Sequence, residues 1–221
     1  MGSAPSFIEI VENRIAGNSV RLPVFNTTAA RVQQEIGREE PDLRLIEKLI
    51  VSDQALTAEV LRFSNSSFYK GLTQVSTVRN AIVRLGINEV SNIVTMVAHE
   101  NQFRSKDPFL NGVMRKLWCH ALATAMAAHW LSRHCGLHGI AHEAFFAGLL
   151  HDVGKLFILT VIDDLQQSGD LSVKPPVSLL MEAMDDLHAT HGYALMRHWN
   201  LPEKYSRVVR DHHAASLEVD N

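Results

Sequence analysis

The sequence predicts an all-α protein arranged in two helical lobes. Apolar residues recur at helical spacing along most of the chain, as in the set Leu43, Ile46 and Ile50. No segment shows sustained two-residue alternation bounded by turn signals, so no strand is expected. The chain has 221 residues, with 46% hydrophobic and 20% charged. That balance is typical of a globular protein and excludes a disordered one.

Several helices can be placed from their start and stop signals. Asp53 is predicted to be the N-cap of a helix that carries Leu56 and Val60. Gly86 is predicted to end a short helix and to precede another. The expected helices, in order, cover residues 43–50, 54–63, 76–86, 87–97 and 109–134, and further helices carry the later histidines. Residues 103–108 form the best internal boundary, and residues 166–176 the longest predicted loop.

Charge and hydropathy exclude some classes of partner. The net charge is −3 and the pI is about 6.4, so no nucleic-acid footprint is expected. The apolar stretch from Ile140 to Ile162 is interrupted by charged residues and histidines, which argues against a membrane span. No signal peptide is evident, and Cys119 and Cys135 are expected to be reduced structural thiols. We therefore expect a cytoplasmic protein that binds neither nucleic acid nor membrane.

The stretch "GLLHDVGKLF" places His151 and Asp152 between two apolar runs. On a continuous helix His151 would share a face with Ala147 and Gly148, whose small side chains leave room for an ion. Asp152 would lie about 100° around the same helix, within reach of that ion. The pair is therefore a candidate metal site.

Histidines on three further helices are predicted to face inward. His188 shares a helical stripe with Leu195, and His212 shares one with Val208. His120 stands at the edge of the apolar stripe of the long helix. Periodicity thus nominates a set of inward donors: His120, His151, Asp152, His188 and His212, with His213 partly inward.

This donor set predicts the class of metal. Five imidazoles and one carboxylate suit iron, manganese or zinc far better than calcium or magnesium. Buried imidazoles without partners would be costly, and a shared metal removes that cost. The alternative is that His151 and Asp152 form a buried hydrogen-bonded pair and that the other inward histidines are satisfied core residues. Six more histidines are expected to be surface or packing residues: His129, His134, His138, His142, His191 and His198.

The quoted residues resemble a known family. "FFAGLLHDVGKLFIL" is similar to the HD signature of metal-dependent phosphohydrolases. Residues 49–69 and 75–94, followed by "LWCHALATA", "HATHGYALMRHWNLP" and "HH", resemble in order the HDOD (HD-related output domain) proteins. This resemblance covers roughly residues 21–213. It implies one continuous HDOD domain: an N-terminal helix or arm (1–20), an HDOD-specific helical lobe (21–105) and, packed on it, an HD-like lobe (106–221).

The resemblance also implies roles for the site. The related HD-GYP phosphodiesterases hold metals with residues that correspond to His120, His151, Asp152, His188, His212 and His213. Lys155 corresponds to the lysine that follows the HD pair. The chain departs from those enzymes after His213, where their acidic residue and GYP segment are absent. Asp211 is predicted to point away and Asp220 lies in the tail, so the acidic ligand of a second metal is missing or displaced.

Three functions remain open at this stage. The first is a bacterial regulatory output domain that contacts signalling proteins, namely kinases, receivers or cyclic-dinucleotide enzymes, with a vestigial metal site. The second is a metal-dependent phosphohydrolase acting on a nucleotide or cyclic-dinucleotide phosphoester, with Asp152 and Lys155 as the reacting groups. The third is a sensor that binds a small phosphorylated ligand without turnover. The missing segment favours the first, in which the chain is not an enzyme.

Overall fold

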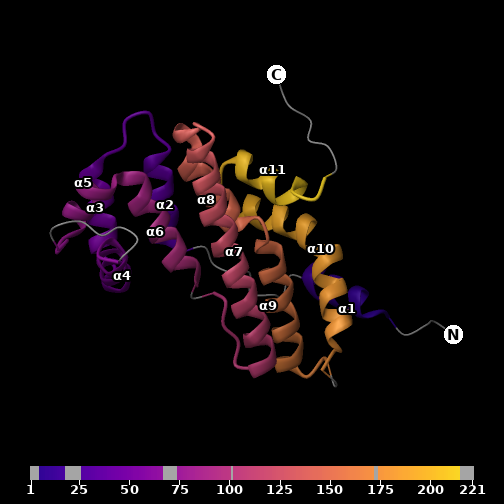
Figure 1. The fold of residues 1–221 in the computed structure, drawn as a ribbon. Coiled ribbons are helices and arrows are strands. Elements are labelled where there is room, and N and C mark those ends of the chain that lie inside the picture. The colour runs from indigo at the N-terminus through magenta and orange to yellow at the C-terminus, as the bar shows by residue number, and fades with distance from the viewer. Residues whose placement is uncertain (1–4, 18–25, 67–73, 101, 172–173, 215–221) are drawn as a thin grey trace. The chain divides into compact units, whose positions relative to one another are not determined.

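Every regular element in the described part of the chain is a helix, which confirms the predicted all-α class. The computed structural model describes residues 5–17, 26–66, 74–100, 102–171 and 174–214 (Figure 1). The elements are α1 (Phe7–Ala16), α2 (Thr27–Ile36), α3 (Leu43–Val51), α4 (Gln54–Ser64), α5 (Val78–Leu85), α6 (Ile87–Glu100), α7 (Pro108–His134), the 3-10 helix η1 (His138–Ile140), α8 (Ala141–Leu150), α9 (Val153–Ser168), α10 (Val177–His198) and α11 (Glu203–Asp211).

The chain divides into two compact units. Unit 1 takes residues 1–23, 103–126 and 147–221, and unit 2 takes residues 24–102 and 127–146. The helices α7 and α8 therefore contribute residues to both. The predicted lobe boundary at residue 105 lies close to one of these limits, but residues 127–146 belong to unit 2. The packing of one lobe on the other stays a prediction.

Unit 2 is built around α6. Its ten consecutive residues from Val90 to His99 are all buried, and α2, α4 and α5 pack against it. A helix that is buried on every side must satisfy its polar groups within the protein. Gln33 of α2 supplies the hydrogen-bond donor for two of the polar side chains of α6. Its Nε2 donates to Ser91 Oγ at 2.8 Å and to Thr95 Oγ1 at 2.9 Å.

The helix start signal at Asp53 and the stop signal at Gly86 act as predicted. The side chain of Asp53 accepts hydrogen bonds from the first backbone N–H groups of α4, which confirms it as the N-cap. Gly86 has a φ of 85° and ends α5, a conformation that disfavours other residues. The long helix begins at Pro108, one residue before the expected start, because proline fits the first turn of a helix.

In unit 1, α10 runs along α9, and α11 packs on α10 (Figure 1). The backbones of α9 and α10 approach so closely that a Cβ on Gly154 would lie 1.8 Å from the carbonyl oxygen of His188. Gly192 faces the same crossing. The first helix joins this unit through Arg14, whose Nη2 lies 2.7 Å from Asp164 Oδ2 of α9.

Two sequence expectations are wrong in their boundaries. The HD pair does not lie on one continuous helix, because α8 ends at Leu150 and α9 starts at Val153. His151 and Asp152 form the turn between them. The predicted loop at 166–176 begins later, since α9 continues to Ser168 and ends at Gly169, whose φ is 81°. Residues 172–173 of that loop lie outside the described residues.

One stretch of the described residues, His138–Ser168, is long and apolar enough by composition to cross a membrane. Its mean hydropathy is 1.7, and 78% of its most apolar window is buried in the protein. The turn at residues 151–152 also divides it into separate helices. A buried core segment explains these properties, so the stretch gives only weak evidence for a membrane span.

Candidate metal centre

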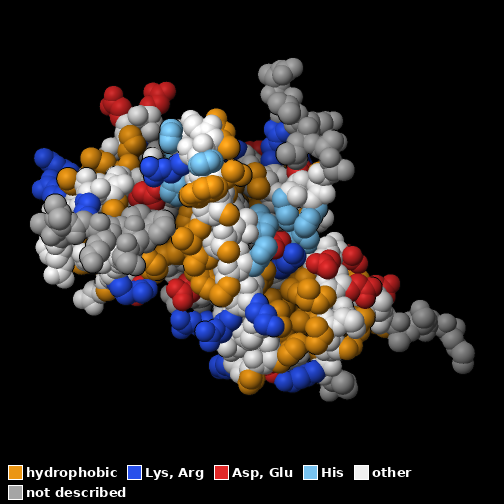
Figure 2. Space-filling model, in the orientation of Figure 1, with side chains coloured by type: hydrophobic (Ala, Val, Ile, Leu, Met, Phe, Trp, Pro, Cys, Tyr) orange, Lys and Arg blue, Asp and Glu red, His pale blue; other side chains and the backbone are white. Residues whose placement is uncertain are grey.

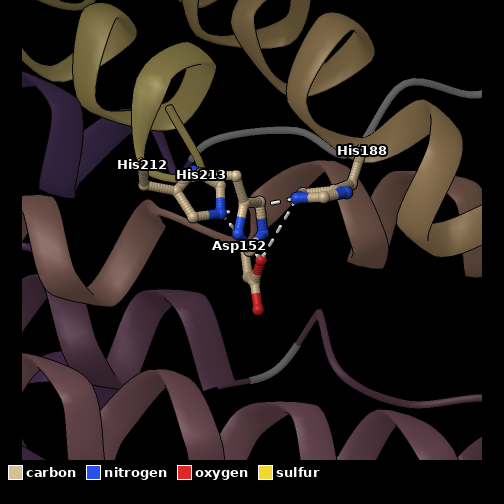
Figure 3. A group of neighbouring side chains, drawn as sticks. All are labelled: Asp152, His188, His212 and His213. Carbon is tan, nitrogen blue, oxygen red and sulfur yellow. Dashed lines mark hydrogen bonds and ion pairs between the residues drawn. The ribbon is translucent and has the colours of Figure 1, made fainter. Parts of the chain in front are cut away.

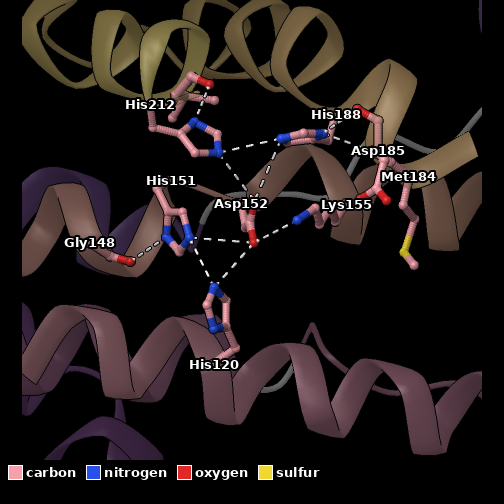
Figure 4. A network of polar contacts seen from close by, with 10 residues as sticks. His120, Gly148, His151, Asp152, Lys155, Met184, Asp185, His188 and His212 are labelled. Carbon is pink, nitrogen blue, oxygen red and sulfur yellow. Dashed lines mark hydrogen bonds and ion pairs between the residues drawn. The ribbon is translucent and has the colours of Figure 1, made fainter. Parts of the chain in front are cut away.

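Five histidines and one lysine surround the carboxylate of Asp152 in unit 1 (Figures 3 and 4). They come from α7, from the turn between α8 and α9, from the first turn of α9, from α10 and from the end of α11. Two groups have their donor atoms within 4.8 Å of one another, and Asp152 belongs to both. One group is Asp152, His188, His212 and His213, and the other is His120, His151 and Asp152.

Each carboxylate oxygen of Asp152 faces a different set of partners (Figure 4). Oδ2 lies 3.4 Å from His151 Nε2 and 3.5 Å from His120 Nε2. It also accepts a hydrogen bond of 3.1 Å from Lys155 Nζ. Oδ1 lies 3.5 Å from His212 Nε2 and 3.8 Å from His188 Nε2. One carboxylate therefore joins the two groups.

Backbone carbonyls fix the tautomers of three of these imidazoles. The Nδ1 atom of His151 lies 2.8 Å from the carbonyl oxygen of Gly148. His188 Nδ1 lies 2.8 Å from that of Met184, and His212 Nδ1 lies 3.0 Å from that of Val209. Since a carbonyl only accepts, each Nδ1 carries the proton. The Nε2 lone pairs of the neutral rings are consequently directed at Asp152.

Burial and charge set the protonation of the centre. Asp152 and His188 are 4% and 2% exposed. Burial raises the pKa of the Asp152 carboxyl, but its contacts with His151 and His212 and the positive charge of Lys155 hold it below its ordinary value. Burial lowers the pKa of His188, and the charge of Lys155 acts in the same direction. An ionised carboxylate and a neutral imidazole are the forms that bind metals.

Small residues bring the donor helices together. A Cβ on Gly148 would lie 2.9 Å from the Cα of Ala125, so α8 can approach α7 closely and place His151 near His120. The two Nε2 atoms are 3.2 Å apart. Gly154 has the corresponding role between α9 and α10, where it brings Asp152 and His188 together. The sequence showed Gly148 as a small neighbour but gave no sign of the contact at Gly154.

The donor set fits a transition-metal ion. His188 Nε2 and His212 Nε2 lie 3.4 Å apart, and both face Asp152 Oδ1, which is buried without a hydrogen-bond partner. Because both Nδ1 protons go to carbonyls, three acceptors converge with no donor when the rings are neutral. A shared cation removes this repulsion, and imidazole with carboxylate suits zinc, iron or manganese.

The structure brings the predicted site residues together, but they differ in exposure. The side chain of His120 is 57% exposed, whereas those of His151 and His212 are 12% and 14% exposed. Asp211 forms an ion pair with Arg210 and belongs to neither donor group, as its predicted outward direction implies. Asp220 lies outside the described residues. The role of the six residues as ligands stays a prediction.

The two cysteines and His99 belong to neither donor group of the described residues. Cys119 and Cys135 are free thiols as expected, but both are exposed and so do not pack in the core. His99 received no role from the sequence, yet it is 1% exposed and burial lowers its pKa to about 4. Its position inside the apolar run of α6 was the available signal.

Comparison with known proteins identifies the family of the chain. Residues 22–215 match the HDOD domain family. The chain belongs to the HDOD family. Solved structures share its fold: an HDOD domain protein of unknown function from Geobacter sulfurreducens has a TM-score of 0.73 at 24% identity, over 96% of this chain and 72% of that one.

Two further solved structures cover most of the chain. A candidate metal-dependent phosphohydrolase from Shewanella amazonensis has a TM-score of 0.73 at 22% identity, covering 92% of this chain and 72% of that one. A candidate signal transduction protein from Marinobacter aquaeolei has a TM-score of 0.66 at 20% identity, covering 97% of this chain and 52% of that one. At these identities the likeness establishes the fold.

Among curated proteins, an uncharacterized protein of Treponema pallidum is 26% identical over 200 residues, which make up 87% of this chain and 37% of that protein. The uncharacterized protein YuxH of Bacillus subtilis is 26% identical over 70 residues, or 32% of this chain and 17% of that protein. The chain thus spans well under half the length of the curated relatives it matches.

Proposed function

We propose that this chain is a regulatory output domain of bacterial signal transduction that holds a transition-metal ion at Asp152 and acts by contacting signalling proteins. The observation that carries the metal assignment is the convergence of His188 Nε2, His212 Nε2 and Asp152 Oδ1 without a donor. The regulatory role is supported by membership of the HDOD family and by relatives that are much longer than this chain.

The residues divide into ligands and supports in this proposal. His188, His212 and Asp152 would hold the ion, with His213 as the fourth donor of the same group. The bound metal would act as a cross-link between segments distant in sequence and as a Lewis acid. Lys155 holds Asp152 Oδ2, and the carbonyl oxygens of Met184 and Val209 orient the two imidazoles. Replacement of a ligand, or of the supporting residue Lys155, should weaken metal binding.

Metal analysis tests this centre directly. The protein should be purified without chelators and its metals measured by mass spectrometry, for the native chain and for Asp152→Ala. We expect zinc, iron or manganese near one equivalent in the native chain and a large loss in the variant. His198→Gln is the matched control, because His198 is an exposed histidine of α10. A metal-free native protein would disprove the centre.

A metal-dependent phosphohydrolase is the second candidate, and one observation favours it. Asp152 belongs to both donor groups, an arrangement compatible with two metals bridged by one carboxylate, as in enzymes that hydrolyse phosphoesters. Here Lys155 would stabilise charge on the phosphate. Metal-loaded protein should be assayed on a panel of phosphodiesters and nucleotides. Turnover that is lost in Asp152→Ala would establish this function, and its absence from a metal-loaded protein would support the regulatory one.

The partner requires its own experiment. Crosslinking in the source cell, followed by mass spectrometry, should identify a kinase, a receiver or a cyclic-dinucleotide enzyme bound to the chain. Binding of that protein should then be repeated with both purified components. Failure of every such protein to bind would contradict the regulatory role and leave the metal result standing.

A further inference from the structure

Unit 2 contains a second group of histidines, separate from the residues around Asp152. A pocket of about 170 Å³ is lined by side chains from α6, α7, η1 and α8: Asn88, Glu89, His129, Arg133, His138 and His142. In Figure 2, histidine and basic side chains lie together over the N-terminal end of α8. These histidines were predicted to be surface or packing residues, so the pocket is a feature that the sequence did not indicate.

The fold brings these side chains together from positions far apart in the sequence. His129 and Arg133 are one turn apart on α7 and so share a face. The chain then reverses after Gly136, whose φ is 80°, and η1 and α8 return His138 and His142 to that face. Asn88 and Glu89 come from the first turn of α6. Three separate segments therefore contribute polar side chains to one pocket.

Arg133 supplies a positive charge to the pocket. Glu89 is engaged by His129, with Oε1 and Nε2 3.1 Å apart and both side chains less than 20% exposed. His142 Nε2 lies 4.0 Å from Glu143 Oε1, at the long limit of an ion pair. Within the described residues, the side chains of Arg133 and His138 form no ion pair or hydrogen bond. A guanidinium and an imidazole are thus available to a ligand.

We propose that this pocket binds the phosphate group of a small molecule. An arginine fork, imidazole N–H groups and the amide of Asn88 are donors that match the several acceptor oxygens of a phosphate. A carboxylate ligand has fewer acceptor atoms for the same donors. A metal is a poorer match, since the residues of this pocket belong to neither of the described donor groups that could hold an ion. The site is independent of the proposed metal centre.

The test is a titration of the full chain with inorganic phosphate, followed by NMR of the histidine side chains. The protein is first treated with chelator, so that phosphate cannot bind through a metal at Asp152. We expect saturable shifts of the His138 and His142 resonances, and no such shifts of His188 and His212. Sodium chloride at equal ionic strength is the control for screening.

Variants of Arg133 test the pocket itself. Arg133→Ala should weaken phosphate binding about tenfold or more, because a charge-assisted bidentate contact is lost. Arg133→Lys should recover only part of the affinity, since an ammonium lacks the planar fork. Arg115→Ala is the matched control, because Arg115 is an exposed arginine of the same helix but lies outside the pocket. This control should bind phosphate as the native chain does.

The outcomes separate this site from the metal centre. Absence of saturable binding, equal weakening by Arg115→Ala, or shifts confined to His188 and His212 would each overturn the phosphate pocket. None of these results bears on the metal content, which is measured separately. O-phosphoserine and inorganic phosphate should both bind, and tighter binding of the first would assign the ligand to a phosphate ester. Arg133 is exposed, so Arg133→Ala is expected to fold, and unchanged thermal unfolding checks this.

Discussion

His188 of α10 and His99 of α6 are equally buried, yet their surroundings differ. His188 is 2% exposed and faces Asp152 and His212, while a backbone carbonyl holds its other nitrogen. His99 is 1% exposed, and burial alone lowers its pKa to about 4. Burial of a histidine is therefore weak evidence for a metal site. The convergence of a carboxylate and oriented imidazoles is what distinguishes the first from the second.

The largest effect is expected where the α9–α10 contact is broken. Gly154→Ala should lower the free energy of unfolding by more than about 3 kcal/mol, since its Cβ would lie 1.8 Å from the His188 carbonyl oxygen. Metal content should fall with it, because His188 is displaced from Asp152. Urea unfolding and metal analysis measure the two effects. Gly112→Ala in α7 meets no atom within 4 Å and should stabilise by up to about 1 kcal/mol. A Gly154→Ala protein as stable as the native chain would show that α9 and α10 can move apart without a loss of stability.

His99 should make unit 2 sensitive to acid. Its pKa is lowered to about 4 in the folded protein, whereas an unfolded histidine titrates near pH 6.5. The unfolded chain thus binds the proton first, so stability is present above about pH 6.5 and is lost as the pH falls towards 4. The loss should approach about 3 kcal/mol.

The variant His99→Met should lack this part of the pH dependence. Urea unfolding at pH 7 and pH 4.5 measures the difference between native and variant. His198→Gln, at an exposed position, should keep the native slope. Identical pH slopes for His99→Met and the native chain would show that His99 does not resist protonation in the fold.

Chelation should affect only the region around Asp152. If the ion is present at a hundredfold excess over its dissociation constant, its removal should lower stability by roughly 2 to 3 kcal/mol. His188→Ala should show little further response to chelator. His120→Ala should keep most of the response, because that side chain is 57% exposed and, among the described residues, no backbone carbonyl accepts a hydrogen bond from its ring. Thermal unfolding with and without chelator decides this, and an equal response in all three proteins would argue against His188 as a ligand.

The smallest effect concerns the polar residues buried on α6. Gln33→Met removes the donor to Ser91 Oγ and Thr95 Oγ1, which should cost about 1 kcal/mol. Both hydroxyls can turn to carbonyls of their own helix, which keeps the cost low. Gln34→Met, at the exposed neighbouring position, should change stability by less than about 0.5 kcal/mol. Metal content should be native in both variants, and a loss of metal in Gln33→Met would contradict the separation of the two regions.

Helical spacing in the sequence was sufficient to nominate the residues that surround Asp152. His188 and His212 recur with apolar neighbours at three- and four-residue intervals, and the structure brings both to the same carboxylate. The turn at His151 and Asp152 was not predictable in this way. Apolar residues continue at helical spacing on both sides of the pair, and no proline interrupts them. The end of α8 and the start of α9 depend instead on contacts with other helices.

Helical spacing in the sequence predicts even less about the proposed phosphate pocket. His138 and His142 lie about fifty residues from Asn88, and local periodicity carries no information on which distant segments meet. Only the chain reversal after Gly136 places them beside His129 and Arg133. The sequence could show that these histidines avoid the apolar core, but not that they share a pocket.

Asp152 occupies the N-cap position of α9, but its side chain makes no capping hydrogen bond. Its carboxylate points to the histidines and to Lys155 instead, whereas Asp42 and Asp53 cap their helices. A missing cap costs about 1 kcal/mol. Under the proposed metal role, metal binding and helix capping therefore compete for the carboxylate of Asp152. Replacing Asp152 with serine should restore the cap while abolishing the proposed metal binding, so the restored cap should offset part of the stability lost with the ion.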